Sequence, residues 1–296
     1  MRHPPRAAGL APDLADVPVF ESGFDADQAA VWRHQLFPEP AARNAALMIP
    51  AGREPGKFFV LAVNSMPDLS LWTEVGRSFP YWTFPQIDGV KRVDNIPDSA
   101  LRQFRRHYGH QVSRDDIFFY VYALLHSPTY QDGLGAVPRL PSVPLVASNQ
   151  PFWALAQAGS DLFHLHIKFA DAPPWPGLAI TGDIAGWDDA PVTLMTYGQR
   201  LVDGLESTDK TVIICNQLVT VSGLPLSAQR YRLGTQSGLD RLVEHCSGRD
   251  RWVGDSQRQR LRLGAVQDML AKVVTISLRT VAIVDSLPKL EFRQRP

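Results

Sequence analysis

The sequence predicts an α+β fold: a β-rich N-terminal part, a central helical layer, and then a β-hairpin and a long C-terminal helix. Short apolar runs bounded by Gly and Pro dominate about the first hundred residues, which is typical of strands. Farther along, apolar side chains recur every three or four positions, which is typical of helices. No repeat of about 20 to 50 residues is found, which disfavours a solenoid or a propeller.

Two apolar runs, Asn44 to Pro50 and Lys57 to Asn64, predict a pair of strands, and the AGREPG between them predicts their turn. The GREPGK string superficially resembles a phosphate-binding loop. However, its glycines are one residue too close together, and Phe58 stands where a Ser or Thr would hold magnesium. A turn is therefore the better interpretation.

The central layer is predicted to begin with a helix from Ser99 to Tyr108, because Leu101, Phe104 and Tyr108 have helical spacing. Gly109 supplies its C-terminal stop. A later helix is predicted from about Phe152 to His164, after a loop rich in proline.

Between these two, the string DIFFYVYALLHSPTY predicts a helix from Asp115 to His126. Ser113 stands three residues before Asp116, the spacing of a capping box, and Pro128 is expected to end the helix. Its run of aromatic rings predicts packing on both sides, with the Tyr120 and Tyr122 hydroxyls reaching partners at the rim.

The C-terminal part predicts three elements. The run Thr211 to Pro225 alternates on either side of Asn216-Gln217, which favours a hairpin. SGLDRLVEHC then reads as a short amphipathic helix. A long helix is predicted over about Gln257 to Leu287, with a possible interruption near Leu263-Gly264. Its VVTIS centre is β-branched, so a strand is the main alternative there.

The composition is that of a folded protein of 296 residues, large enough for one unit or two. No apolar run reaches the roughly 18 residues of a membrane span, and the chain is expected to be cytoplasmic. Residues 1–19, rich in Pro, Ala and charge, are expected to be a disordered lead-in. Cys215 and Cys246 have no CxxC partner, so we expect two buried, inert thiols rather than a zinc site or a disulfide framework.

The formal net charge is zero, which disfavours a protein that coats nucleic acid indiscriminately. The charge is unevenly spread, because Ala228 to Pro296 holds thirteen Lys or Arg against seven Asp or Glu. Arg outnumbers Lys by 24 to six. Arg can contact phosphate or guanine at two points, although a G+C-rich genome would produce the same bias.

Several segments resemble, in the same order, the C-terminal target-recognition region of type ISP restriction-modification enzymes. The segments are Gln35 to Asn44, Met66 to Phe84, Ile96 to Gly109, Asp116 to Tyr130, Phe152 to His166 and Val273 to Leu290. The family's members are large polypeptides that join nuclease, translocase, methyltransferase and specificity modules. The resemblance covers the chain from about Phe20 onward and implies a specificity region, with a β-rich part (20–95), a helical part (96–170) and a mixed basic part (171–296).

The resemblance implies a module that recognises a site on duplex DNA for a methyltransferase and translocase chain encoded upstream, without catalysis of its own. Those modules would need far more chain, so we expect a separate specificity subunit, a fragment or a gene remnant. The alternative is an interaction module or decayed remnant that docks on such a chain without binding DNA. The expected DNA-docking residues are Arg102, Arg105, Arg106, Arg230, Arg232, Arg241, Arg258, Arg260 and Arg262.

The chain departs from the family pattern at residues 231–239. The family's Tyr-x-x-Asn-Gly-Arg-Ser-Ala-Leu motif is only partly matched there, and Gly-Thr-Gln replaces Asn-Gly-Arg. This replacement weakens the expectation of DNA contact near Gln236.

Two short motifs could suggest other chemistry. SNQPF, from Ser148 to Phe152, faintly resembles the Asn-Pro-Pro-aromatic motif of amino-methyltransferases but lacks its middle Pro. His164 and His166 could supply two metal ligands on a strand, whereas on a helix end their rings diverge. We therefore predict no catalytic centre, no cofactor and no metal site.

Overall fold

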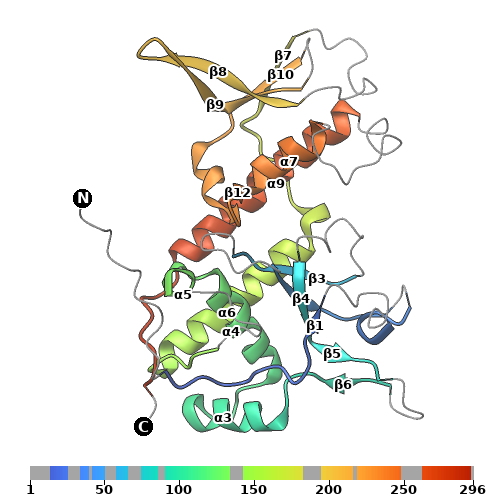
Figure 1. The fold of residues 1–296 in the computed structure, drawn as a ribbon, viewed down its shortest axis with the longest axis vertical. Coiled ribbons are helices and arrows are strands. Elements are labelled where there is room, and N and C mark those ends of the chain that lie inside the picture. The colour runs from blue at the N-terminus through green and yellow to red at the C-terminus, as the bar shows by residue number, and fades with distance from the viewer. Residues whose placement is uncertain are drawn as a thin grey trace. The chain divides into compact units, whose positions relative to one another are not determined.

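The computed structural model describes residues 14–25, 34–39, 42–50, 58–65, 75–85, 91–133, 143–182, 195–215, 219–247 and 262–294 (Figure 1). The chain divides into two compact units. Unit 1 consists of Met1–Ile167 and Ile283–Pro296, and unit 2 of Lys168–Ala282. Both contain helices and antiparallel sheets, so the predicted α+β class is confirmed. Among the described residues, no helix is both long enough and apolar enough to cross a membrane.

Unit 1 contains a four-stranded antiparallel sheet in the order β1-β4-β2-β3 and a two-stranded sheet of β5 and β6. The strands are β1 (Phe24–Asp25), β2 (Ala46–Pro50), β3 (Leu61–Val63), β4 (Val75–Pro80), β5 (Trp82–Thr83) and β6 (Val93–Asp94). The predicted pairing of the first two apolar runs is confirmed, because Ala46 lies opposite Val63. The AGREPG between them lies outside the described residues.

The described part of the predicted lead-in packs against unit 1. Residues 1–13 lie outside the described part of the chain. Val17 and Val19 are buried in the core, and the Val17 amide donates to the Val143 carbonyl at 3.0 Å. The fold therefore begins earlier than expected, because the partner of Val17 lies more than a hundred positions away and leaves no local signal.

The central helices of unit 1 are α3 (Asp98–Tyr108), α4 (Arg114–His126), α5 (Pro128–Gly133) and α6 (Asn149–Ile167). The predicted capping box is present, because Ser113 Oγ accepts from the Asp116 amide at 3.1 Å and Asp116 Oδ2 accepts from the Ser113 amide at 2.8 Å. The predicted stop at Gly109 is also present, with φ at 110°. Pro128 follows the end of α4 but also begins α5, since a proline in the first helical turn gives up no intrahelical hydrogen bond.

The helix α4 packs on both sides, as its aromatic residues predict. Every residue from Ile117 to Leu125 except Phe119 is buried. The Tyr120 hydroxyl donates to the Pro144 carbonyl at 2.5 Å, and the Tyr122 hydroxyl lies 2.6 Å from His166 Nδ1 on α6. These two bonds satisfy polar groups that burial would otherwise leave unpaired.

The C-terminal segment of the chain completes unit 1. The Arg293 amide donates to the Leu145 carbonyl at 2.8 Å, and the Ala15 amide donates to the Arg293 carbonyl at 3.0 Å. Residues near the beginning, middle and end of the sequence thus meet in extended pairing.

Unit 2 contains a four-stranded antiparallel sheet in the order β7-β10-β9-β8 and the small β11–β12 hairpin. Its elements are the 3-10 helix η2 (Phe169–Asp171), β7 (Ala179–Gly182), β8 (Thr196–Val202), β9 (Leu205–Ile214), β10 (Val219–Ser222), the 3-10 helix η4 (Leu226–Arg230), β11 (Arg232–Leu233), β12 (Gln236–Ser237), α7 (Gly238–Cys246) and α9 (Leu263–Asp285). The predicted hairpin is confirmed as the pairing of β9 with β10, although its turn at Asn216-Gln217 lies outside the described residues.

The predicted long C-terminal helix is α9, which begins at Leu263, where the prediction placed a possible interruption. The predicted helical residues from Gln257 to Leu261 lie outside the described part of the chain. The alternative of a strand at VVTIS is wrong. Val266, Leu270 and Val274 are all buried at helical spacing in the core of unit 2, and this packing outweighs the β-branched preference.

Candidate nucleic-acid interface

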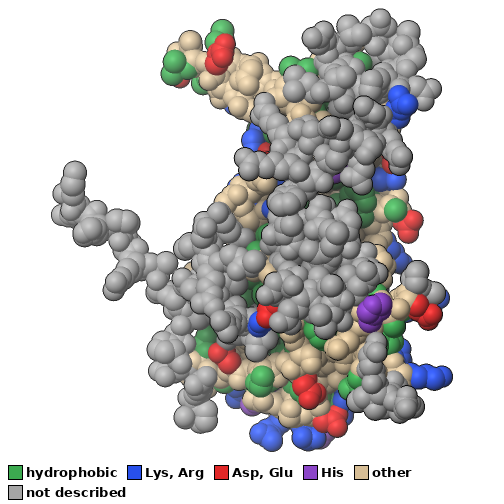
Figure 2. Space-filling model, turned by 45° about the vertical axis from the view of Figure 1, so that its right-hand side comes forward, with side chains coloured by type: hydrophobic (Ala, Val, Ile, Leu, Met, Phe, Trp, Pro, Cys, Tyr) green, Lys and Arg blue, Asp and Glu red, His purple; other side chains and the backbone are tan. Residues whose placement is uncertain are grey.

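The helix α3 presents a basic face. Its apolar stripe, which includes Leu101 and Phe104, is buried in unit 1. The three arginines predicted to dock on DNA, Arg102, Arg105 and Arg106, are all exposed. Figure 2 shows Lys and Arg side chains at its lower end, where Figure 1 places α3. The structure therefore brings these three predicted residues together.

The basic face is partly fixed in place. Arg105 Nε donates to the Val112 carbonyl at 2.8 Å, which ties that side chain to the turn after α3. Asp98, in the first turn of the same helix, is paired with Arg114, and Arg114 Nε also lies 3.5 Å from Asp94. These pairs draw the nearby carboxylates toward Arg114 and leave the outward arginines as a positive surface.

The half-buried Arg293 lies near this surface, and the sequence did not reveal it. Partial burial lowers the pKa of His107, and the charges of Arg293 and Arg106 lower it further. Arg293 thus lies close enough to α3 to act on its side chains electrostatically. No local pattern indicates this, since the backbone pairing of Arg293 with Ala15 and Leu145 joins distant parts of the chain.

In unit 2, the predicted arginines lie on separate elements, and two of them support the β11–β12 turn. Arg232 Nη2 donates to the Thr235 carbonyl, and Arg241 Nη2 donates to the Leu233 carbonyl at 3.2 Å. Arg230 and Arg262 are exposed, at the end of η4 and just before α9. Arg258 and Arg260 lie outside the described residues.

The side chain of Gln236 follows this turn and faces α7. Its Nε2 donates to Glu244 Oε2 at 2.6 Å. In the resembling family an Arg stands at this position, whereas this chain has an amide held by a carboxylate. The turn therefore presents less positive charge than the family pattern implies.

A polar network fixes the sheet of unit 2 to α7. Lys210 Nζ on β9 donates to Asp240 Oδ1 at 2.7 Å and lies 5.3 Å from the ring centre of Tyr197 on β8. The Tyr197 hydroxyl accepts from Gln229 Nε2 at 3.2 Å, and Gln229 Oε1 accepts from Ser237 Oγ at 2.6 Å. Because Lys210 is paired with Asp240, its charge stabilises the fold and is less available to bind phosphate.

The same network explains the charge of Asp240. Burial alone would raise the pKa of this carboxyl, but hydrogen bonds from Lys210, the Ser237 backbone and Tyr197 lower it below its ordinary value. Ser237 Oγ accepts from the Asp240 amide at 2.9 Å, which makes a second capping box, at the start of α7. Asp240 is therefore an ionised support for both the helix and the sheet.

The two histidines considered as metal ligands, His164 and His166, have different partners. His166 contacts Tyr122 inside the helix pair, whereas the exposed His164 lies 2.8 Å from the Ser160 carbonyl on its own helix. No group of three His, Cys, Asp or Glu in the described part of the chain could hold a metal ion. The thiols of Cys215 and Cys246 are buried, which raises their pKa to about 11 and about 12.

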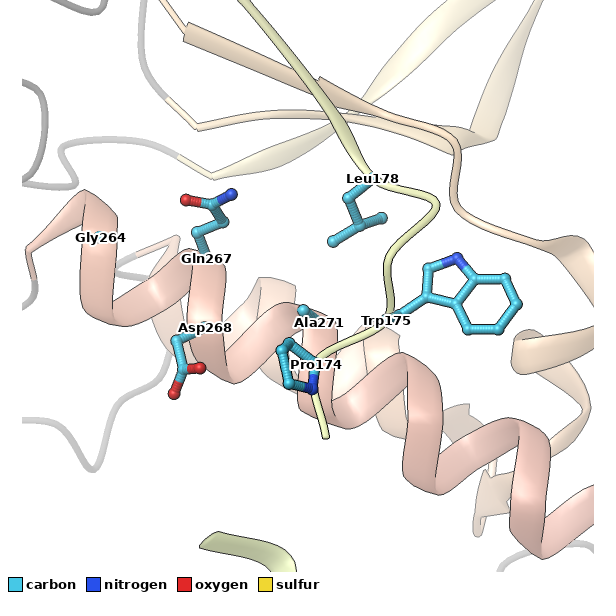
Figure 3. Close-up of a pocket in the computed structure, with 7 residues that line it drawn as sticks. All are labelled: Pro174, Trp175, Leu178, Gly264, Gln267, Asp268 and Ala271. Atoms are coloured by element: carbon cyan, nitrogen blue, oxygen red, sulfur yellow. The ribbon is translucent and has the colours of Figure 1, made fainter. Parts of the chain in front are cut away.

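A shallow pocket of about 250 Å³ lies in unit 2 between α9 and the segment around Trp175 (Figure 3). Gln267, Asp268 and Ala271 line it from the helix, and Leu178 lines it from the other side. Asp268 is paired with Lys272 at 2.8 Å. Its lining residues include no Ser, Cys or His, and the one carboxylate among them is the Asp268 paired with Lys272.

Comparisons with known proteins show which family the chain matches. The family model of the type ISP C-terminal specificity domain matches residues 24–251. A comparison with curated proteins gives no match.

Among solved structures, the chain is similar to DrdV in a DrdV–DNA complex, with 27% identity and a TM-score of 0.71 over 88% of this chain and 26% of that one. LlaGI, as a nuclease-deletion mutant of a type ISP restriction-modification enzyme in complex with a DNA substrate mimic, shares 22% identity and a TM-score of 0.64 over 88% and 22%. LlaBIII, an ATP-dependent type ISP restriction-modification enzyme bound to DNA, shares 19% identity and a TM-score of 0.69 over 88% and 17%.

The chain thus spans about a quarter or less of each of these proteins. The family match covers most of the present chain, and the likeness in fold to the three structures extends over the same two units. The chain belongs to the family of type ISP C-terminal specificity domains.

Proposed function

We propose that this chain is the DNA target-recognition module of a type ISP restriction-modification system and performs no catalysis itself. The observation that carries the proposal is the match to the specificity-domain family over residues 24–251. The three similar structures are all DNA complexes, which supports duplex DNA as the ligand. A module with this function acts on the genome, so we place it in the cytoplasm.

The partner would be a chain that carries the methyltransferase and translocase modules. Support comes from length, because this chain corresponds to 17–26% of the similar proteins. Recognition and catalysis would then be divided. The present chain would select the site, and the remainder of the enzyme would modify, translocate or cleave.

The basic face of α3 would hold the DNA backbone. Arg102, Arg105 and Arg106 are exposed on one helix, and Arg293 adds charge beside them. Exposed guanidinium groups suit phosphate oxygens, which fix a protein on the duplex without reading its sequence. In unit 2, the exposed Arg230 and Arg262 are candidates for the same role, whereas Arg232 and Arg241 would act mainly by supporting the β11–β12 turn.

Replacing Arg102, Arg105 and Arg106 together by Gln tests this role. We expect weaker binding to all duplex sequences, because phosphate contacts are lost. Each lost contact should make the negative slope of log K against log salt less steep by about 0.9. Fluorescence anisotropy with a labelled duplex, repeated at several salt concentrations, measures the slope. Thermal melting of the variant checks that the fold survives.

A charge-matched control is the variant R43Q/K91Q/K168Q, which removes three exposed cations outside α3. It should leave most of the salt slope intact. Equal losses in the two variants would mean that net charge alone sets binding and would contradict a docking role for α3. If the unmodified chain shows no salt-dependent binding, even with a methyltransferase–translocase partner added, the proposed function itself is wrong.

A further inference from the structure

The strands β8 and β9 extend beyond the rest of their sheet. The strand β10 pairs with β9 only at Val212–Ile214, whereas β8 and β9 stay paired as far as Val202 and Leu205. Figure 1 shows them as a two-stranded arm. We call residues 199–208 the ribbon. All of them are exposed except Ser207, which is half-buried.

The ribbon ends in a tight two-residue turn. Asp203 and Gly204 have φ values of 52° and 79°, so the two strands are joined by a two-residue turn. Both residues are in the left-handed region, as the type I′ turn requires, and this turn matches the natural twist of a hairpin. The ribbon therefore has no bulky loop at its tip.

The base of the ribbon is held firmly. Tyr197 immediately precedes Gly198, and Lys210 follows Asp209. Both Tyr197 and Lys210 belong to the polar network that reaches Asp240 on α7. Asp209 Oδ1 also accepts from the Thr211 amide and hydroxyl, at 2.9 and 2.6 Å. An arm anchored in this way can present side chains at fixed positions.

The dimensions of the ribbon fit a DNA groove. Four residue pairs, from Gln199 opposite Thr208 to Val202 opposite Leu205, give a length of about 14 Å at about 3.4 Å per residue. The major groove of B-DNA is about 12 Å wide and admits a two-stranded β-ribbon.

The side chains of the ribbon suit base edges better than phosphates. Gln199 lies opposite Thr208, Arg200 opposite Ser207, and Leu201 opposite Glu206. In the major groove, Gln pairs with adenine, Arg with guanine, Ser or Thr with any base, Glu with the cytosine amino group, and apolar side chains with the thymine methyl.

The charge of the ribbon also favours contact with bases over contact with phosphates. Arg200 is its one cation, against Asp203 and Glu206. Such a segment would not gain affinity from phosphates, so affinity must come from basic surfaces elsewhere, such as α3. Phosphate contacts position a protein on DNA, whereas base contacts specify the sequence.

We propose that the β8–β9 ribbon enters the major groove and reads the target sequence, with Arg200 on one face and Gln199 and Thr208 on the other. Alternate residues of a strand point to opposite faces, so these side chains form two possible reading sets. The inference rests on the proposed function and deepens it by naming the specificity-determining residues.

The test selects bound sequences from a randomised duplex library with the full chain and with two variants. R200K keeps the charge but loses the two-point fork, and Q199A/T208A removes the polar pair. In at least one variant we expect the preference at one or more positions of the enriched motif to fall about ten-fold, since a good two-point base contact contributes about 1–3 kcal/mol. Affinity for random duplex and its salt slope should stay unchanged.

R279K is the matched control, because Arg279 is exposed on α9 and the change preserves charge. It should retain the full motif. A motif that persists unchanged in both ribbon variants would overturn the ribbon inference and leave the proposed function standing. A ribbon that docks on another protein module would give this result.

If the unmodified chain binds duplex DNA but enriches no motif, base reading by this chain is excluded. If it binds no duplex DNA, the proposed function fails as well.

Discussion

Gly159 on α6 lies against the backbone of α4. A Cβ atom built on Gly159 would stand 1.8 Å from the Phe119 carbonyl oxygen, far inside any real contact. The two helices can therefore approach so closely only because this residue has no side chain. The buried rings of Phe118 and Phe163, which meet edge to face at 5.8 Å, depend on the same approach.

Substitution of Gly159 by Ala should destabilise the protein. Helix propensity alone would make this change stabilising by about 1 kcal/mol. We expect the opposite sign, a loss of about 1–3 kcal/mol, because the methyl group must push the helices apart. Chemical denaturation measures the free energy of unfolding. Q157A, at an exposed position on the same helix, should change it by less than about 0.5 kcal/mol, and a stabilised G159A would contradict the close packing.

At the scale of elements, α4 and α6 share a pair of histidines. The rings of His126 and His166 lie with their centres 5.6 Å apart, and Tyr122 contacts both of them. Burial lowers the pKa of His126 to about 4, and burial together with the charge of His126 lowers the pKa of His166 to about 3. Both residues keep part of their surface exposed, so water moderates the effect.

This pair should make the folded protein sensitive to acid. Above the ordinary histidine pKa of about 6.5, both rings are neutral in the folded and the unfolded chain, and pH has no effect through them. As the pH falls from about 6.5 toward 4, the unfolded chain binds protons that the folded chain refuses, so the free energy of unfolding should decrease. Denaturation curves between pH 7 and 4.5 measure this loss.

Replacement of His166 by Gln should flatten that pH dependence, whereas replacement of the exposed His164 should leave it unchanged. Equal pH dependence in the original chain and in H166Q would show that other groups control acid sensitivity.

The helices of unit 1 could be predicted well because their signals are local. Ser113 and Asp116 mark the start of α4, and Gly109 marks the end of α3, within a few residues of the elements themselves. The hairpin of β8 and β9 was missed, although the Asp203-Gly204 dipeptide at its turn is a strong hairpin signal. Both faces of the ribbon are exposed, so its strands lack the apolar alternation that marks a half-buried strand.

The candidate interface was also predictable only where its signals are local in the sequence. Arg102, Arg105 and Arg106 follow from the helical period, since the opposite face of α3 is apolar. Arg293 could not be found, because it is held near α3 by backbone pairing with Ala15 and Leu145, which lie far from it in the sequence. The supporting roles of Arg232 and Arg241 depend on turn geometry that charge counting does not reveal.

At the scale of the whole molecule, the two units have separate hydrophobic cores. Leu124 on α4 is fully buried in the core of unit 1, and Leu270 on α9 is fully buried in that of unit 2. Because each core is contiguous within its own unit, we expect each unit to lose its packing without the other.

Calorimetry should therefore resolve two unfolding transitions. L124A should lower the midpoint of one transition and L270A that of the other, since a buried Leu replaced by Ala costs about 2–5 kcal/mol in the unit that contains it. A single transition lowered equally by both variants would mean that the cores unfold together.

The connectivity of the units affects how such proteins can diversify. The chain passes into unit 2 after Ile167 and returns to unit 1 at Ile283, so unit 2 is one continuous insertion within the sequence of unit 1. Two genetic crossovers at these points would exchange the whole insertion between homologous genes while keeping the surrounding core intact. New recognition properties could then arise by cassette replacement as well as by gradual mutation.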